Sequence, residues 1–177
     1  MTPRARTITL FAVVATTSIL RVWFSHRYFG FSSGDDLEIL RAGFMRALDH
    51  DYAPWAIRNL VVSDVLVAPV LWTASRLGID SVQKLCWIGG FPFVVLASVN
   101  SILVHRLALL WLNQPSAAVV AATLYAFHWL PLGYGSTVYP RTASTTCVLV
   151  AALLVSRHGS WGLELEDSRC ESSLSSR

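Results

Sequence analysis

Charged side chains are scarce in this 177-residue sequence. They make up 14% of residues, whereas soluble domains carry about 25%. Hydrophobic residues make up 54%, and this balance indicates a membrane protein. The net charge is only +3, and no basic stripe alternates with aromatic residues. No nucleic-acid partner is therefore expected.

Cysteines and the common catalytic motifs are also missing or few. The three cysteines, Cys86, Cys147 and Cys170, are far apart and show no Cys-x-x-Cys or Cys/His ligand spacing. This excludes a recognisable zinc site and a disulfide framework. No Walker loop, Gly-x-Ser-x-Gly or His-Glu-x-x-His motif occurs, so a soluble nucleotide-handling enzyme has no support. No Asn-x-Ser/Thr sequon occurs either, which fits a bacterial source.

Long apolar runs are what the sequence does contain. A membrane-spanning helix needs about 20 mostly apolar residues, within a range of roughly 17 to 25. Five stretches approach this length: 7–24, 59–76, 85–104, 116–133 and 142–156. We therefore expect an all-α polytopic membrane protein with about five transmembrane helices in residues 1–156. Residues 157–177 hold seven charged residues and six serines, which predicts a disordered tail.

The first apolar run follows Arg4 and Arg6 and lacks a small-x-small cleavage site, so we interpret it as an uncleaved membrane helix. The two arginines favour a cytoplasmic N-terminus, which puts the loop 25–58 outside. Apolar residues recur at helical spacing in this loop and predict an amphipathic helix at the membrane interface: Leu37, Leu40, Phe44 and Leu48.

The acidic segment of that loop has two interpretations. Asp35 as N-cap with Glu38 three residues later resembles a capping box, and acidic residues suit a helix N-terminus. Alternatively, one carboxylate acts as general base toward an acceptor hydroxyl or helps to bind a divalent cation. We take Glu38 as mainly structural. Asp36 and Asp35 are the catalytic candidates, with Asp36 ahead because Asp35 fits the cap.

Two further segments combine aromatic residues with arginine. Trp55 and Arg58 stand before the second apolar run, where they suit either interface anchoring or contact with a phosphate. Tyr139 and Arg141 follow a Gly- and Pro-rich break, where they form either a simple turn or the lining of a polar pocket. If five spans cross the membrane in alternating directions, Arg141 lies on the inner side, away from the acidic pair in the outer loop. Arg58 is therefore the stronger candidate for a site shared with the acidic pair.

Three polar residues lie within apolar runs. Asp64 interrupts the second run. Because an acidic side chain inside a membrane helix costs free energy, the default hypothesis for such a residue is a functional role. Asp64 is close enough to the end of the run to reach the interface instead. Arg21 interrupts the first run, and the same two interpretations, a functional residue inside the membrane or a residue that reaches the interface, apply to it. His128, between Phe127 and Trp129, is more typical of a packed neutral histidine than of a ligand.

The order of these features resembles the polytopic glycosyltransferases of the GT-C superfamily, and within it the mannosyltransferases that use lipid-linked sugars. The matching features are the acidic pair Asp35–Asp36, the Trp-x-x-Arg pattern ending at Arg58, and the Tyr-Pro-Arg-Thr stretch at 139–142. They cover roughly residues 1–156. Members of that family typically have about ten or more membrane helices, so this chain corresponds to an N-terminal part, and we expect a truncated product.

The resemblance implies transfer of a sugar from a polyprenyl-phosphate donor to an acceptor hydroxyl on the outer or luminal face. Asp36 or Asp35 would be the base, and Arg58, Trp55, Arg141 and Tyr139 would bind substrate. A divalent cation is the only cofactor left open. The expected location is the bacterial plasma membrane, with the endoplasmic reticulum membrane as the alternative. The competing hypothesis is a non-enzymatic polytopic protein, such as a transporter part or an assembly subunit, with Asp64 on a polar pathway.

Overall fold

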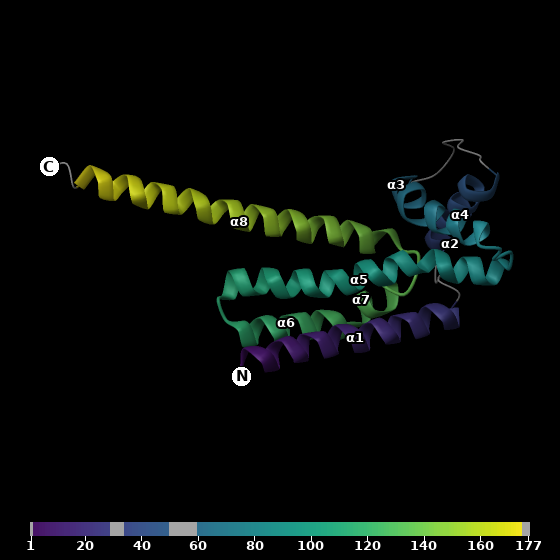
Figure 1. Ribbon diagram of the computed structural model, residues 1–177, viewed down its shortest axis with the longest axis horizontal. Coiled ribbons are helices and arrows are strands. Elements are labelled where there is room, and N and C mark those ends of the chain that lie inside the picture. The colour runs from purple at the N-terminus through teal and green to yellow at the C-terminus, as the bar shows by residue number, and fades with distance from the viewer. Residues whose placement is uncertain (1, 29–33, 50–59, 175–177) are drawn as a thin grey trace.

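The computed structural model describes residues 2–28, 34–49 and 60–174, and within these ranges the side chains of residues 28, 34, 35, 60 and 158–174 lie outside the description. The described residues form helices and no strands, which confirms the all-α expectation for this part of the chain. Figure 1 shows long helices lying side by side, with a group of short helices gathered near the N-terminal half of α5.

The long helices are α1 (Pro3–Tyr28), α5 (Val82–Leu112), α6 (Pro115–Phe127) and α8 (Pro140–Leu174). Their ends follow ordinary capping rules. Thr2 accepts a hydrogen bond from the backbone N–H of Ala5 at 3.3 Å, and Pro3 takes the first helical position, where its missing N–H costs nothing. At the same end of the bundle (Figure 1), α5 ends at Leu112, and its C-cap residue Asn113 adopts a left-handed φ of 48°.

Small side chains let the long helices approach closely. On α6, Ala118, Ala122 and Ala126 recur every four residues and are 0% exposed. Such spacing puts them on one face, and α6 packs against both α1 and α5. The Ser18 and Ser98 hydroxyls meet at 2.7 Å between α1 and α5. Close backbone approach with interhelical hydrogen bonds is how helices associate in lipid, where apolar burial gives no net drive.

The predicted span 116–133 is broken at His128. There α6 ends, His128 adopts an extended backbone (φ −61°, ψ 138°) and α7 (Trp129–Tyr134) begins. The His128 Nδ1 accepts a hydrogen bond from the backbone N–H of Leu130 at 3.3 Å and so caps α7. Pro131 explains the break, because a continuous helix would place its ring against the carbonyl of Phe127.

The predicted span 59–76 also differs from a straight membrane helix. It forms α3 (Leu60–Val62), the π-helical turn η2 (Ser63–Val67) and α4 (Ala68–Arg76). These pack against α2 (Gly34–Phe44) and the π-helical turn η1 (Met45–Asp49). The amphipathic helix predicted in the first loop corresponds to α2 and η1. We call the α2–η1 and α3–η2–α4 segments together the α2–α4 unit.

Two described helices are long and apolar enough to cross a membrane, namely Pro3–Arg27 of α1 and Val82–Leu112 of α5. They contain the predicted spans 7–24 and 85–104. The total of about five spans is not confirmed. The span 142–156 lies within α8, whose backbone helix extends to Leu174. The division at residue 156 into a membrane module and a tail stays a prediction.

Close packing around Gly43 gives a test of the α2–α4 unit. A Cβ at this position would lie 2.5 Å from Val67 Cγ1, and the β-branched Val67 has little rotamer freedom to move away. We expect Gly43→Ala to destabilise the protein by about 1–3 kcal/mol, as overpacking does. Gly133→Ala is the control, since its Cβ would meet nothing within 4 Å. The measurement is the apparent Tm in detergent, and equal Tm values for the two variants would contradict the packing described.

Candidate functional site

Asp36 lies on the buried face of α2. Its side chain is 0% exposed, and its neighbours on that face, Ile39 and Leu40, are 1% and 2% exposed. The helix begins at Gly34, so Asp35 lies inside the first turn and not at the N-cap position predicted for it. The Asp35 side chain is outside the described residues. An acid in the first turn suits the helix dipole, and burial sets Asp36 apart from an ordinary surface cap.

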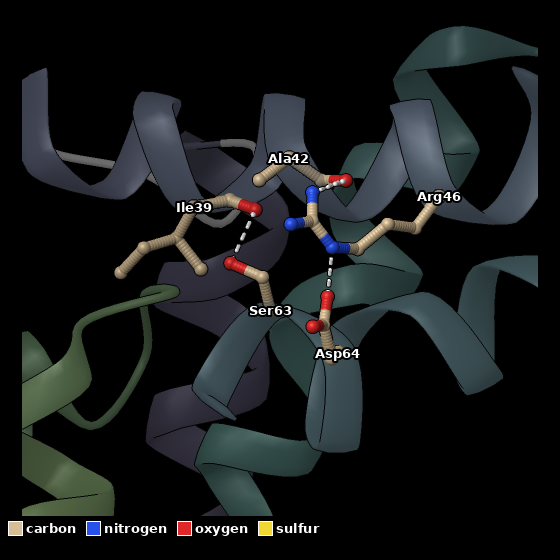
Figure 2. Close-up of polar contacts among 5 residues, drawn as sticks. All are labelled: Ile39, Ala42, Arg46, Ser63 and Asp64. Carbon is tan, nitrogen blue, oxygen red and sulfur yellow. Dashed lines mark hydrogen bonds and ion pairs between the residues drawn. The ribbon is translucent and has the colours of Figure 1, made fainter. Parts of the chain in front are cut away.

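Two polar contacts join α2–η1 to η2 (Figure 2). Arg46 in η1 forms an ion pair through Nε with the Asp64 carboxylate in η2. In the second contact, the Ser63 hydroxyl in η2 donates to the Ile39 carbonyl in α2 at 3.3 Å. Within α2–η1, Arg46 Nη1 also donates to the Ala42 carbonyl at 3.4 Å. Both charged residues lie on π-helical turns. The extra residue in such a turn shifts the side chains around the helix axis relative to a regular α-helix.

The ion pair gives Asp64 a structural explanation. The Arg46 side chain is 3% exposed and the Asp64 side chain 42% exposed. Burying a guanidinium costs free energy unless a counter-charge or hydrogen-bond acceptors compensate it, and the half-exposed Asp64 carboxylate supplies a counter-charge to Arg46. Asp64 therefore stabilises the α2–α4 unit and does not stand alone inside a membrane helix.

A pocket of about 580 Å³ lies where α5, α6, α7 and the start of α8 meet. Two of the predicted site residues, Tyr139 and Arg141, line it. The other lining residues are Ala97, Leu124, Tyr125, His128, Leu130, Pro131, Tyr134, Thr142 and Thr145. Mostly apolar and aromatic walls with a few polar groups are typical of small-molecule sites. The Gly- and Pro-rich break thus forms a pocket and is more than a simple turn.

Stacked aromatic rings form one wall of this pocket. The rings of Tyr134 and Tyr139 stack with centroids 4.4 Å apart. The Arg141 Cζ lies 5.6 Å from the centroid of the Tyr139 ring, which is within cation–π range. Since Arg141 is exposed, its cation stands at the rim with one face on an aromatic ring and the other available to a ligand.

The pocket lies beside the middle of α5, and the α2–α4 unit lies nearer the N-terminal end of that helix. Leu40 of α2 reaches Gly89 of α5, while Gly135 beside the pocket packs on Ala97 of α5. The two contact positions, Gly89 and Ala97, are eight residues apart on α5, which is about 12 Å along a helix axis. Segment 60–76 folds beside α2 and packs on α5 (Figure 1), so it is not a separate straight span. The inner placement of Arg141, expected from five alternating spans, stays a prediction.

Two predicted site residues, Trp55 and Arg58, lie outside the described residues. The predicted divalent cation also lacks a described ligand set, because no group of three or more His, Cys, Asp or Glu side chains clusters among the residues that the structure describes. The side chain of Asp35 is not in that search. His128 is an N-cap for α7 and a lining residue of the pocket.

Three residues of these sites were missed in the sequence: Arg46, Tyr134 and Tyr125. Arg46 was missed because the predicted apolar face, with Leu37 and Leu48, is not the buried face, on which Arg46 follows Ile39 and Gly43 at helical spacing. Tyr134 belonged to a stretch treated as a break. Its spacing of five residues from Tyr139, across Gly135, is a signal for two rings facing each other over a turn.

No family model, curated protein or solved structure matches this chain. The function of the protein is therefore inferred from the geometry of the site and the chemistry of its side chains.

The Arg46–Asp64 pair predicts non-additive mutations. Asp64→Leu leaves the buried Arg46 cation without its carboxylate, and we expect a loss of about 1–3 kcal/mol of stability, reduced from the fully buried case because Asp64 is half-exposed. Adding Arg46→Met removes the buried charge and should recover most of that loss. The measurement is a double-mutant cycle of unfolding free energies. Asp80→Asn, an exposed position between α4 and α5, is the control. Additive single effects would show that the pair contributes nothing.

Proposed function

We propose that this protein is a membrane-embedded glycosyltransferase that takes a sugar, most simply mannose, from a polyprenyl-phosphate donor. The observation that carries the proposal is a fully buried acid, Asp36, in the α2–α4 unit, which contacts α5 at Gly89, about two helical turns from the level of the Tyr139–Arg141 pocket at Ala97. The resemblance of the chain to GT-C enzymes implies an acid and an arginine for this reaction.

Membrane insertion is supported by the outer faces of the long helices. Large apolar side chains are exposed there, including Phe11 at 74%, Trp111 at 67% and Val155 at 72%. A water-facing helix would carry polar residues at such positions, whereas lipid solvates apolar side chains well. In this proposal α1, α5, α6 and α8 lie in the bilayer, and the pocket opens toward its outer or luminal side.

The proposed reaction needs a base and a site for the leaving phosphate. The Asp36 carboxylate takes the proton of an acceptor hydroxyl as the hydroxyl oxygen forms a bond to sugar C1. The bond between C1 and the phosphate oxygen breaks, and the phosphate leaves with the electron pair. Arg141 stabilises the negative charge that develops on that oxygen.

The first test is Asp36→Asn, which keeps the shape of the side chain but removes the base. Loss of a general base lowers rates by about 10²–10⁴, so we expect transfer to fall by at least about 100-fold. The measurement is incorporation of radiolabelled mannose from polyprenyl-phosphate mannose in membranes that contain this chain. Asp49→Asn, at an exposed position of the neighbouring η1 turn, is the matched control and should leave transfer unchanged.

Asp64→Asn separates this proposal from a polar-pathway role for Asp64. It should lower the amount of folded protein and leave transfer per folded molecule intact. Full activity in Asp36→Asn, or no transfer by the unmodified chain, would contradict the proposed function.

A further inference from the structure

The end of the bundle away from the α2–α4 unit, where α1 begins and α5 ends (Figure 1), carries basic side chains and no acidic ones among its described residues. No Asp or Glu occurs in 2–16, 104–120 or 150–157. We call this surface the basic end, and its cations come from three helices: Arg4 and Arg6 of α1, Arg106 of α5, and Arg157 of α8.

The register between α1 and α5 puts the start of one helix beside the end of the other. The two helices run in opposite directions (Figure 1), and the Ser18 and Ser98 hydroxyls meet between them at 2.7 Å. Arg4 lies fourteen residues before Ser18, and Leu112 lies fourteen residues after Ser98. Each is therefore about 21 Å from that contact along its helix axis, and Arg4 stands at about the height of the last turn of α5.

The helix α8 reaches the same height beside α5. Trp111 Nε1, in the last turn of α5, donates to the Ser156 hydroxyl at 2.9 Å, and Arg157 is the next residue of α8. Arg106 is exposed and lies five residues before Trp111. Its long side chain reaches toward the end of α5, as arginines do near a membrane boundary. Three helices thus contribute arginines to one surface.

Apolar and aromatic side chains border the basic end. Leu110, Trp111 and Leu112 are 48%, 67% and 52% exposed. Tryptophan is enriched at the headgroup level of membranes, because its ring is apolar and its N–H forms hydrogen bonds. A soluble anion or a nucleic acid would leave these apolar side chains uncovered. A lipid leaflet covers them with acyl chains and meets the arginines with its headgroups.

The opposite end of the bundle has a different charge balance. Arg76 Cζ lies 5.4 Å from the centroid of the Trp72 ring, and Lys84 is exposed in the first turn of α5. These cations share their end with acids, among them the exposed Asp64 and Asp80. Positive charge is therefore unbalanced at the basic end alone, and an anionic membrane surface attracts that end most strongly.

We propose that the basic end binds the anionic phospholipid headgroups of one membrane leaflet. Guanidinium groups donate to the phosphate oxygens of these headgroups, and each arginine near an anionic surface strengthens the attraction about fivefold. The inference goes beyond the proposed function and shares with it only the insertion of the long helices into a bilayer. None of its residues belongs to the proposed catalytic site.

The test uses the full chain reconstituted in phosphatidylcholine vesicles. Trace amounts of spin-labelled phosphatidylglycerol or spin-labelled phosphatidylcholine are added, and electron paramagnetic resonance measures the fraction of each that the protein immobilises. We expect phosphatidylglycerol to associate about fivefold more strongly at the basic end, or at least about twofold averaged over all lipids that contact the protein. This preference should disappear at about 1 M salt, where the screening length is about 3 Å.

Two double variants assign the preference to one end of the bundle. Arg4→Gln with Arg106→Gln removes two exposed charges from the basic end and should abolish at least about half of the excess association of phosphatidylglycerol, because each charge contributes separately. Arg76→Gln with Lys84→Gln, the matched control, removes two exposed charges from the opposite end and should leave the preference intact. If a variant does not fold, the lipid comparison and its salt dependence in the unmodified chain still decide the proposal.

Equal association of the two lipids, or a preference that persists at high salt, would overturn the proposal. A loss of preference in the control that matches or exceeds the loss at the basic end would overturn it too, since the effect would then belong to net charge or to the other end. The measurement involves no sugar transfer. A chain that transfers no sugar would contradict the glycosyltransferase function and leave the lipid-binding surface standing.

Discussion

The hydrogen bonds from Arg21 to the carbonyls of Ala126 and Pro131 hold the arrangement on which the rest of the bundle depends. The break at His128 leaves carbonyls at the end of α6 without helical partners, and such groups need a donor when they are buried. Arg21 supplies it from α1. The α6–α7 turn is thereby fixed against α1, and the chain enters α8 at the level of Asn100, whose amide donates to the Thr142 carbonyl at 3.2 Å.

Polar side chains in this protein join helices that apolar contacts alone would not orient. Ser18–Ser98, Asn100–Thr142 and Arg46–Asp64 each connect two helical elements that are distant in the sequence. In an apolar surrounding such contacts have strict geometry, since an unsatisfied polar group is costly. Apolar packing permits many rotations of one helix against another, and the polar pairs select one of them. This explains why the charges in the apolar runs have mainly structural contacts.

The sequence predicted the positions of the helices better than their continuity. Apolar length located the stretches that became α1 and α5, because that signal depends on composition alone. The break in 116–133 was missed, although Pro131 lies inside the run and excludes a regular helix there. The folding of 60–76 beside α2 was not predicted, because it depends on tertiary contacts, namely the Arg46–Asp64 pair and the apolar core shared by Leu40 and Leu71. Asp36 and the Tyr139–Arg141 pair were singled out from local pattern and stay site predictions. Tyr125 lines the pocket, and Arg21 reaches the carbonyl of the lining residue Pro131, only through tertiary contacts.

The fold of segment 60–76 also decides which chemistry is geometrically open to the protein. In the proposed membrane arrangement, a separate pass by this segment would put Asp36 and Arg141 on opposite faces, where no single substrate reaches both. Because it packs against α2, the α2–α4 unit and the pocket contact α5 about 12 Å apart, at Gly89 and Ala97. An acid in the unit and a cation in the pocket suit the proposed substrate, whose reacting bond lies between a neutral acceptor and an anionic leaving group. Glycosyl transfer from a lipid phosphate is a reaction of that kind.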